Sequence, residues 1–133
     1  MSVFDASVVV PLLLPVPGQP TPGVNLTESQ IHAPQLLSIE VANALWRYAR
    51  TRLVSTIDAK RAWSKFEILP FRFAEDRDLA PQALILAEAL AHPVYDCIYL
   101  ALALARGTRL VTRDKRFAAA ARASYAKQVE LID

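Results

Sequence analysis

The chain has 133 residues, of which 53% are hydrophobic and 21% are charged, and three are glycine. This size and composition predict a single folded domain over residues 1–133 with a large apolar core, and they exclude a disordered chain. Fifteen Lys and Arg against thirteen Asp and Glu give a net charge of +2, so bulk charge does not indicate a nucleic-acid-binding protein and any polyanion site must be local.

The first half of the chain is predicted to contain two strands and three helices. The expected strands are 2–5 and 31–33, and the expected helices are 6–14, 35–53 and 57–68. Pro11 is compatible with the first helix if it lies in the first turn. Four prolines and two glycines make 15–23 a loop, while 25–29 is weakly specified. Ser55 or Thr56 should cap the third helix, which we expect to form a hairpin with the second.

The second half is predicted to add three strands and three helices. The expected strands are 71–73, 109–112 and 129–132, and the expected helices are 78–90, 95–105 and 113–124. His92 and Pro93 form the break before the almost wholly apolar helix 95–105, and Gly107 should close that helix. Strands that alternate with helices predict an α/β protein, here a three-layer α/β/α fold with a central parallel sheet of four or five short strands.

The location of the chain in the cell is predicted from its cysteine and its apolar runs. Cys97 is the single cysteine, and no CxxC pair or His-rich tract offers a zinc or redox site, so we expect a reducing compartment, the cytoplasm. The apolar stretch 7–16 follows Asp5, lacks a preceding Lys or Arg and contains Pro11 and Pro15, which is unlike a signal peptide. No apolar run approaches the ~20 residues of a transmembrane helix, and we expect no membrane association.

Four acidic residues have mainly apolar neighbours, where an ionised carboxylate is costly: Asp5, Glu40, Asp96 and Asp114. Asp5 ends the first strand and Asp114 lies two residues beyond 109–112, so both would lie at carboxyl ends of parallel strands, where open α/β sheets bind ligands. Asp96 shares the buried stripe of its helix, and Glu40 lies in the first turns of its helix with Asn43 and Arg47 on the same side.

Taken singly, each acid has a simpler interpretation, since an Asp after a strand usually caps a helix and a Glu in a second turn is usually solvated. Their common place on the crevice side of one sheet favours a site. Converging carboxylates repel each other unless a divalent cation supplies the opposite charge, and oxygen ligands favour Mg2+ or Mn2+ over zinc. Such ions commonly serve the hydrolysis of phosphodiester bonds, in which the metal orients and activates a water molecule.

Four segments carry a family resemblance. They are 3–7 (VFDAS), 33–34 (AP) followed by 39–45 (IEVANAL), 95–103 (YDCIYLALA) and 110–114 (LVTRD). In order and spacing they resemble the signature blocks of PIN-domain nucleases, especially the VapC toxins of prokaryotic toxin-antitoxin pairs. The sequence departs from that pattern at 20–23, where many relatives carry a short helix that we expect to be truncated, and at Cys97, where Ala is more usual.

The resemblance implies a Mg2+- or Mn2+-dependent endoribonuclease in which Asp5, Glu40, Asp96 and Asp114 form the acidic quartet. It also implies a cognate VapB-like antitoxin that blocks the site. Supporting polar groups would be Ser7, Thr112 and Asn43, although helix capping and strand filling explain Ser7 and Thr112 equally well. We expect the antitoxin to cover the acids or to insert a basic side chain, with Arg favoured over Lys because its guanidinium can bind two carboxylates.

Several further residues have two interpretations each. Arg113, Lys115 and Arg116 would contact RNA phosphates, or else form a solvated basic helix start. Trp46 and Trp63 would stack on bases, or else belong to the core or a dimer surface. His32 and His92 have no carboxylate partner at ligand spacing and are interpreted as structural. The wide apolar face formed by Leu45, Trp46, Ala49 and Leu53 predicts a homodimer.

The sequence gives less support to three alternative functions. A phosphatase built on an N-terminal Asp usually needs a second acid two residues later, and that position is Ser7 here. A nucleotide-binding α/β domain needs a glycine-rich phosphate loop, which three scattered glycines do not provide. The remaining alternative is a PIN-like module that binds RNA or protein without cleavage, and the presence of all four acids argues against it.

Overall fold

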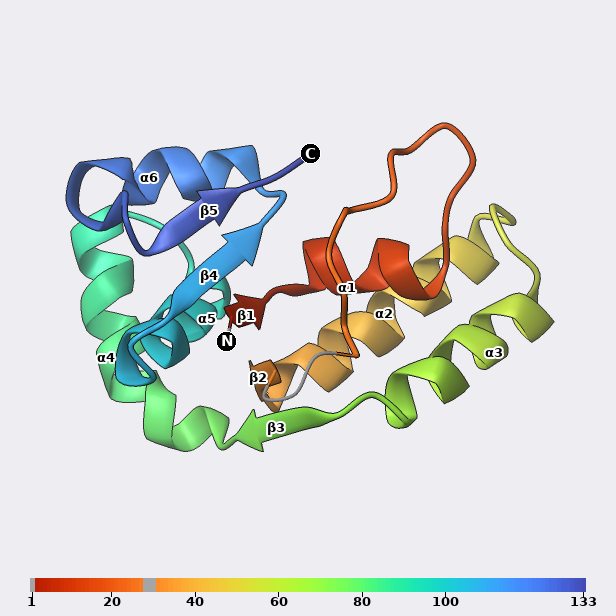
Figure 1. Cartoon of the computed structure of the whole chain (residues 1–133), viewed down its shortest axis with the longest axis horizontal. Coiled ribbons are helices and arrows are strands. Elements are labelled where there is room, and N and C mark those ends of the chain that lie inside the picture. The colour runs from red at the N-terminus through yellow and green to blue at the C-terminus, as the bar shows by residue number, and fades with distance from the viewer. Residues whose placement is uncertain (1, 28–30) are drawn as a thin grey trace.

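The computed structural model describes residues 2–27 and 31–133 of the chain (Figure 1). Within these ranges the chain forms five strands and six helices. The strands are β1 (Ser2–Phe4), β2 (Ile31–Pro34), β3 (Phe71–Ala74), β4 (Arg109–Thr112) and β5 (Val129–Leu131). The helices are α1 (Ala6–Leu13), α2 (Leu36–Arg50), α3 (Thr56–Glu67), α4 (Asp76–Leu90), α5 (Val94–Ala105) and α6 (Lys115–Tyr125).

The strands form one parallel sheet in the order β3-β2-β1-β4-β5. Helices α1, α2 and α3 lie on one side of the sheet and α4, α5 and α6 on the other, as right-handed crossovers require (Figure 1). The predicted three-layer fold is confirmed, with five strands. Because the strand order reverses between β1 and β4, the carboxyl ends of these two strands form the crevice where such sheets bind ligands.

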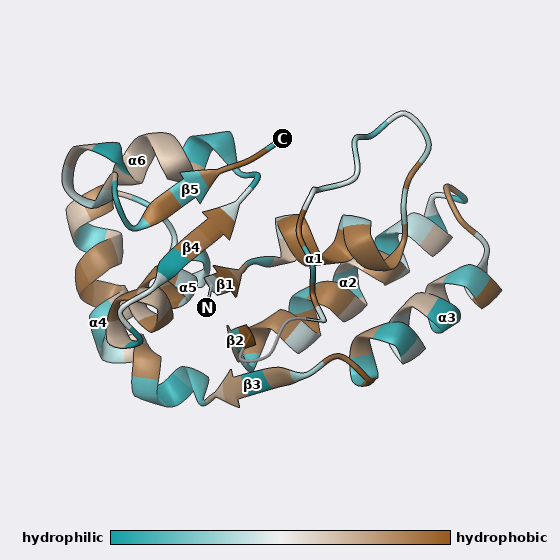
Figure 2. Cartoon of the chain, in the orientation of Figure 1, coloured by the Kyte–Doolittle hydropathy of each residue, from teal (hydrophilic) through white to brown (hydrophobic). Residues whose placement is uncertain are grey.

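Helix α5 is the most deeply buried helix. Its residues 97–103 are all buried, since the helix packs on β1, β2 and β4 and against α4. Figure 2 shows the contrast with α3, where hydrophilic and hydrophobic residues alternate around a helix at the surface. Gly107 follows α5 with a positive φ of 62°, which confirms the predicted closing residue.

One helix boundary differs clearly from its prediction. Helix α2 ends at Arg50 and not at Leu53, because Arg52 takes a left-handed conformation with φ 61° and the chain turns toward α3. The other boundaries agree with the predicted ones within two residues. Helix α4, for example, begins at Asp76 and not at Asp78. The carboxylates of these two residues lie in its first turn and stabilise the helix by interacting with the positive end of its dipole.

The segment that precedes β2 also contains a correction. Pro11 lies in the second turn of α1 and not in the first, and because it has no N–H it removes one backbone hydrogen bond from a helix that ends two residues later. From 14 to 27 the described residues form no helix, as expected for 15–23 and for the truncation at 20–23. Residues 28 and 29 of the weakly specified segment 25–29 lie outside the described residues.

Two further expectations about the helices can be compared with the structure. Ser55 caps α3 by accepting a hydrogen bond from the amide of Asp58 at 3.0 Å, and α2 packs against α3 as the predicted hairpin.

In the described ranges no single helix is long and apolar enough to cross a membrane. The pair α4 and α5, bent by 115°, meets that criterion together, by length and composition alone.

Candidate active site

All four predicted acids line one cleft of about 480 Å³ at the carboxyl ends of β1 and β4. They come from four separate parts of the fold: the residue after β1, the body of α2, the first turn of α5 and the residue before α6. The cleft is further lined by polar side chains that include Ser7, Asn43, Arg47 and Arg113. The structure therefore brings together residues that are up to 109 positions apart, as Asp5 and Asp114 are.

Asp5 is the most buried of the acids, with 6% of its surface exposed. Its Oδ1 accepts hydrogen bonds from the Ser7 amide at 3.1 Å and from Ser7 Oγ at 2.5 Å, while its Oδ2 accepts one from Thr112 Oγ1 at 2.5 Å. Burial raises the pKa of Asp5 to about 6, and the charge of Asp96 acts in the same direction, although the bonds from Ser7 and Thr112 lower it. An opposite charge in the cleft would favour the ionised form.

The hydroxyl groups of Ser7 and Thr112 connect the two strand ends. Ser7 Oγ accepts a hydrogen bond from the Arg113 amide at 2.8 Å, and Thr112 Oγ1 accepts one from the Asp114 amide at 3.0 Å. This follows from the register, which pairs Phe4 with Val111 and so sets the residue after β1 beside the end of β4. Both hydroxyls thus contact Asp5, and their predicted contribution to the site stays a prediction.

Asp114 combines both interpretations considered for it. Its Oδ1 accepts hydrogen bonds from the amides of Arg116 at 3.0 Å and Phe117 at 3.1 Å, so it is the N-cap of α6, which begins at Lys115 and not at Arg113. Asp114 also lines the cleft. A capping role therefore fixes this carboxylate at the edge of the site without removing it from the site.

Glu40 is held by a residue that the sequence analysis did not identify as part of the site. The fully buried Tyr99 donates a hydrogen bond from its hydroxyl group to Glu40 Oε1. Burial raises the pKa of Glu40, and the charges of Asp96 and Asp5 add to the effect, while the bond from Tyr99 lowers it. Burial and the neighbouring Glu40 raise the pKa of Tyr99, so its hydroxyl stays protonated and remains a donor.

The interpretation of His92 as a residue without a carboxylate partner was wrong. His92 Nε2 lies 2.6 Å from Asp96 Oδ2. The two residues are four positions apart, but the break at Pro93 concealed the pairing, because Pro93 is the N-cap of α5 and His92 reaches past it to the first turn. His32 is half-buried on β2 and is not among the residues that line the cleft.

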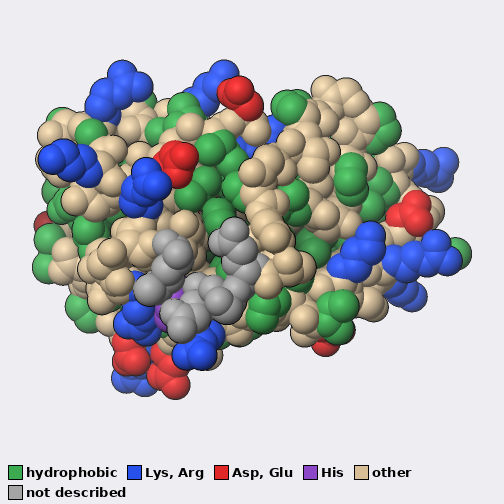
Figure 3. Space-filling model, viewed as in Figure 1, with side chains coloured by type: hydrophobic (Ala, Val, Ile, Leu, Met, Phe, Trp, Pro, Cys, Tyr) green, Lys and Arg blue, Asp and Glu red, His purple; other side chains and the backbone are tan. Residues whose placement is uncertain are grey.

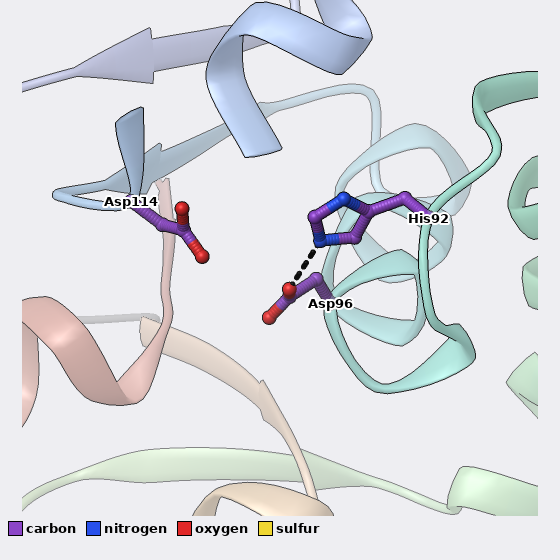
Figure 4. A group of neighbouring side chains, drawn as sticks. All are labelled: His92, Asp96 and Asp114. Carbon is purple, nitrogen blue, oxygen red and sulfur yellow. Dashed lines mark hydrogen bonds and ion pairs between the residues drawn. The ribbon is translucent and has the colours of Figure 1, made fainter. Parts of the chain in front are cut away.

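Three side chains are close enough together to bind one metal ion. His92, Asp96 and Asp114 each offer a ligand atom, and these atoms all lie within 4.8 Å of one another (Figure 4). With Asp5 and Glu40 in the same cleft, the donors are mainly carboxylate oxygens, which suit a hard divalent cation. The described residues that line the cleft or form this group therefore suit a divalent cation and include no thiolate.

The basic residues near the acids divide into two groups. Arg113 and Arg47 line the cleft, whereas Lys115 and Arg116 are exposed at the start of α6 and are not among the lining residues. On the face of the molecule in Figure 3, Lys and Arg side chains are scattered around the periphery and do not form one patch. Positive charge close to the acids is thus provided by Arg47 and Arg113.

Comparison with known proteins identifies the family. The profile of the PIN domain matches residues 2–123, which is nearly the whole chain. The chain belongs to the PIN-domain family. Ribonuclease VapC3 of Pyrobaculum aerophilum is 32% identical over 122 residues, covering 87% of this chain and 91% of that protein. Ribonuclease VapC12 of Mycobacterium tuberculosis is 31% identical over 118 residues, covering 89% and 90%. The resemblance to VapC-type PIN domains is therefore confirmed.

A solved structure agrees with this PIN-domain fold. A toxin-antitoxin complex from Klebsiella pneumoniae superposes with a TM-score of 0.60 at 19% identity, over 89% of this chain and 91% of that chain. At that identity the likeness concerns the fold alone. The arrangement of strands and helices in this chain is thus shared with a solved structure.

Proposed function

We propose that this PIN-domain protein is a metal-dependent endoribonuclease of the VapC type, which hydrolyses phosphodiester bonds of RNA at the acidic cleft. The convergence of four carboxylates from four segments of the chain carries the proposal. The names of the VapC ribonucleases that it resembles support the nuclease activity. RNA as the substrate is consistent with the cytoplasm, where we also place the protein.

The metal ion would be Mg2+ or Mn2+, held by Asp5, Asp96 and Asp114, with Glu40 as a further ligand directly or through water. The raised pKa values of Asp5 and Glu40 support this assignment, since such buried carboxylates ionise more readily when a cation is bound. When bound, a divalent ion supplies a Lewis acid that activates water and neutralises negative charge at the phosphate. The hydroxyls of Ser7 and Thr112 hold Asp5 in place for this role.

The basic residues of the cleft would bind the RNA backbone. Arg113 follows β4 directly, and its amide is fixed by Ser7 Oγ, so its side chain starts from a rigid position beside the acids. Arg47 lines the same cleft from α2. Phosphate contacts of this kind position a nucleic acid without reading its sequence, so the cleft residues predict binding and orientation of RNA but no particular target.

A cognate VapB-like antitoxin would inhibit the enzyme by covering the acids or by inserting a basic side chain among them. The resemblance to the VapC toxins of toxin-antitoxin pairs supports a protein partner of this type. An Arg is favoured because one guanidinium can bind two carboxylates. A structure of the complex that leaves the acidic cleft open and empty would contradict this part of the proposal.

We further propose a homodimer, although the expected apolar face needs one correction. Leu45 is buried in the core and cannot contribute, whereas Trp46 and Leu53 are each more than half exposed. Ile39, which precedes Trp46 by seven residues on α2, is also exposed and extends this face along the helix. Light scattering at micromolar concentration should give the mass of a dimer, and Trp46→Glu should reduce it to that of a monomer.

The central experiment is a cleavage assay on structured RNA with EDTA, followed by addition of Mn2+ or Mg2+. We expect EDTA to abolish cleavage, the metals to restore it, and Asp114→Asn to remain inactive with metal present. Asp58→Asn is the matched control, because Asp58 is an exposed acid of α3. Cleavage that is indifferent to EDTA would refute the metal mechanism, and RNA binding without cleavage under all these conditions would favour the non-catalytic binding module.

A further inference from the structure

His92 contacts Asp96 of the acidic site but does not itself line the cleft. Asp96 lines the cleft, but His92 is not among the lining residues, and only 9% of its side chain is exposed against 30% for Asp96. His92 Nε2 lies 2.6 Å from Asp96 Oδ2, a distance typical of a strong bond to a carboxylate (Figure 4). One oxygen of Asp96 is therefore occupied by a buried partner, and this contact does not involve the other oxygen.

The His92 ring and backbone are themselves held in place. The ring packs edge-on against Phe117 with 4.8 Å between the ring centroids. The His92 amide donates a hydrogen bond to the carbonyl oxygen of Ala87 at 3.2 Å. Ala91 before it has a left-handed conformation with φ 50°, and Pro93 after it has a fixed φ, so the backbone around His92 is restricted. A donor fixed in this way can determine the orientation of its acceptor.

The same contacts connect Asp96 with Asp114. Phe117, which packs against the His92 ring, donates its amide hydrogen bond to Asp114 Oδ1. A continuous set of contacts therefore runs from Asp96 through His92 and Phe117 to Asp114. Figure 4 shows the Asp114 carboxylate pointing toward the other two side chains, and the ligand atoms of the three residues lie within 4.8 Å of one another.

We propose that His92 is a positioning residue that fixes Asp96 through Nε2 and leaves the second carboxylate oxygen available to the metal ion. This inference rests on the proposed metal-dependent function. Hydrogen bonds to ligating carboxylates orient the ligands, and loss of such a partner typically lowers metal affinity by ~10- to 100-fold. A direct role of His92 as a ligand is the competing arrangement, and it would require Nε2 to leave Asp96.

The test is calorimetric titration of Mn2+ into the metal-free protein, compared between variants. His92→Leu keeps an apolar side chain against Phe117 but has no donor, so we expect a thermal midpoint near the wild-type value and a Kd for Mn2+ raised by ~10- to 100-fold. His92→Gln places an amide nitrogen close to the position of Nε2 and should keep the Kd within about threefold. His92→Asn is polar but too short to reach Asp96, and it should behave like His92→Leu.

His32→Leu is the matched control, because it removes the other histidine, which does not line the cleft. Its Kd for Mn2+ should stay at the wild-type value. The positioning role is overturned if folded His92→Leu or His92→Asn binds Mn2+ as tightly as wild type. It is also overturned if electron paramagnetic resonance of the bound Mn2+ detects a nitrogen ligand that His92→Leu removes. A wild-type protein that binds no Mn2+ would instead overturn the proposed function on which this inference rests.

Discussion

The two halves of the cleft hold their acids by different means. Asp5 and Asp114, the strand-end acids, accept hydrogen bonds from backbone amides two or three residues further along the chain. Glu40 and Asp96, the helix acids, accept hydrogen bonds from the side chains of Tyr99 and His92. Asp5 also accepts hydrogen bonds from the hydroxyls of Ser7 and Thr112. The strand-end acids are thus bound to the local backbone, whereas the helix acids are held by side chains alone.

The strand-end acids and the helix acids also differ in what they contribute to the stability of the fold. A strand-end acid also begins a helix, so its substitution affects local structure as well as charge. A helix acid is not the N-cap of its helix, and its orientation depends on one buried donor. The strand-end half should therefore respond to substitution in both stability and activity, and the helix half mainly in activity. The predictions that follow test this division.

The largest effect is expected for cleavage by Asp5→Asn. The change removes a ligand charge while Asn can still accept a hydrogen bond from Ser7, so the fold should persist. Loss of a direct ligand should reduce the cleavage rate by more than the ~100-fold typical of losing an outer partner. RNA cleavage under saturating Mn2+ measures this, with Asp58→Asn as the control. Activity at the wild-type level would remove Asp5 from the metal centre.

The same substitution should stabilise the metal-free protein at neutral pH. Because the pKa of Asp5 in the folded state, about 6, lies above its ordinary value of 3.8, the free energy of unfolding falls as pH rises from about 4 to about 6. Asp5→Asn removes that loss, which corresponds to about 3 kcal/mol at most and less if the amide bonds Thr112 poorly. Urea unfolding in EDTA should therefore give a gain at pH 8 and none at pH 3.5. An equal gain at both values would contradict a charge effect.

Removing the buried hydroxyl of Thr112 or of Tyr99 tests the strand-end half and the helix half of the cleft separately. Thr112→Val removes the bond to Asp5 and the acceptor for the Asp114 amide, so it should lower the free energy of unfolding by roughly 1–3 kcal/mol. Tyr99→Phe removes one bond, to Glu40, and should cost about 1 kcal/mol. It should also raise the pKa of Glu40, because the Tyr99 bond lowers it, and so shift the acid limb of the cleavage profile to higher pH. Equal stability losses without that shift would contradict the division.

The sequence could predict the strand-end half better than the helix half. A carboxylate at the end of an apolar strand is visible locally, and the alternation of strands and helices places both strand-end acids at one edge of a parallel sheet. These four stand out from the thirteen acidic residues by their apolar neighbours, and the family blocks contain the same four. The partners of the helix acids were missed, because Tyr99 is 59 residues from Glu40 and resembles an ordinary core residue.

Helix ends and exposed faces were predicted less well for a related reason. Apolar periodicity continues from Leu45 to Leu53, but it gives no sign of the left-handed conformation of Arg52, which follows the end of α2 at Arg50. Periodicity also cannot assign an apolar residue to the core or to the surface. Leu45 is buried beside the exposed Trp46, because α2 packs on α1 and α3 through one part of its apolar face. These features depend on tertiary packing, which the local sequence does not specify.

The smallest effect is expected for Arg113→Ala, at the border between the two halves. The Arg113 amide bonds Ser7 Oγ and is retained, so the substitution removes the side chain while the strand-end network stays intact. RNA affinity in EDTA should weaken modestly, and the slope of log K against log salt should decrease in magnitude by about one phosphate contact, ~0.7 to 0.9. Arg122→Ala, an exposed position in the last turn of α6, is the matched control and should leave the slope unchanged. Because Arg113 lies outside the acidic quartet, the Kd for Mn2+ should also stay at the wild-type value. A fall in Mn2+ affinity together with RNA affinity would instead show that the Arg113 side chain supports the strand-end acids. Its role could then not be assigned to phosphate binding alone.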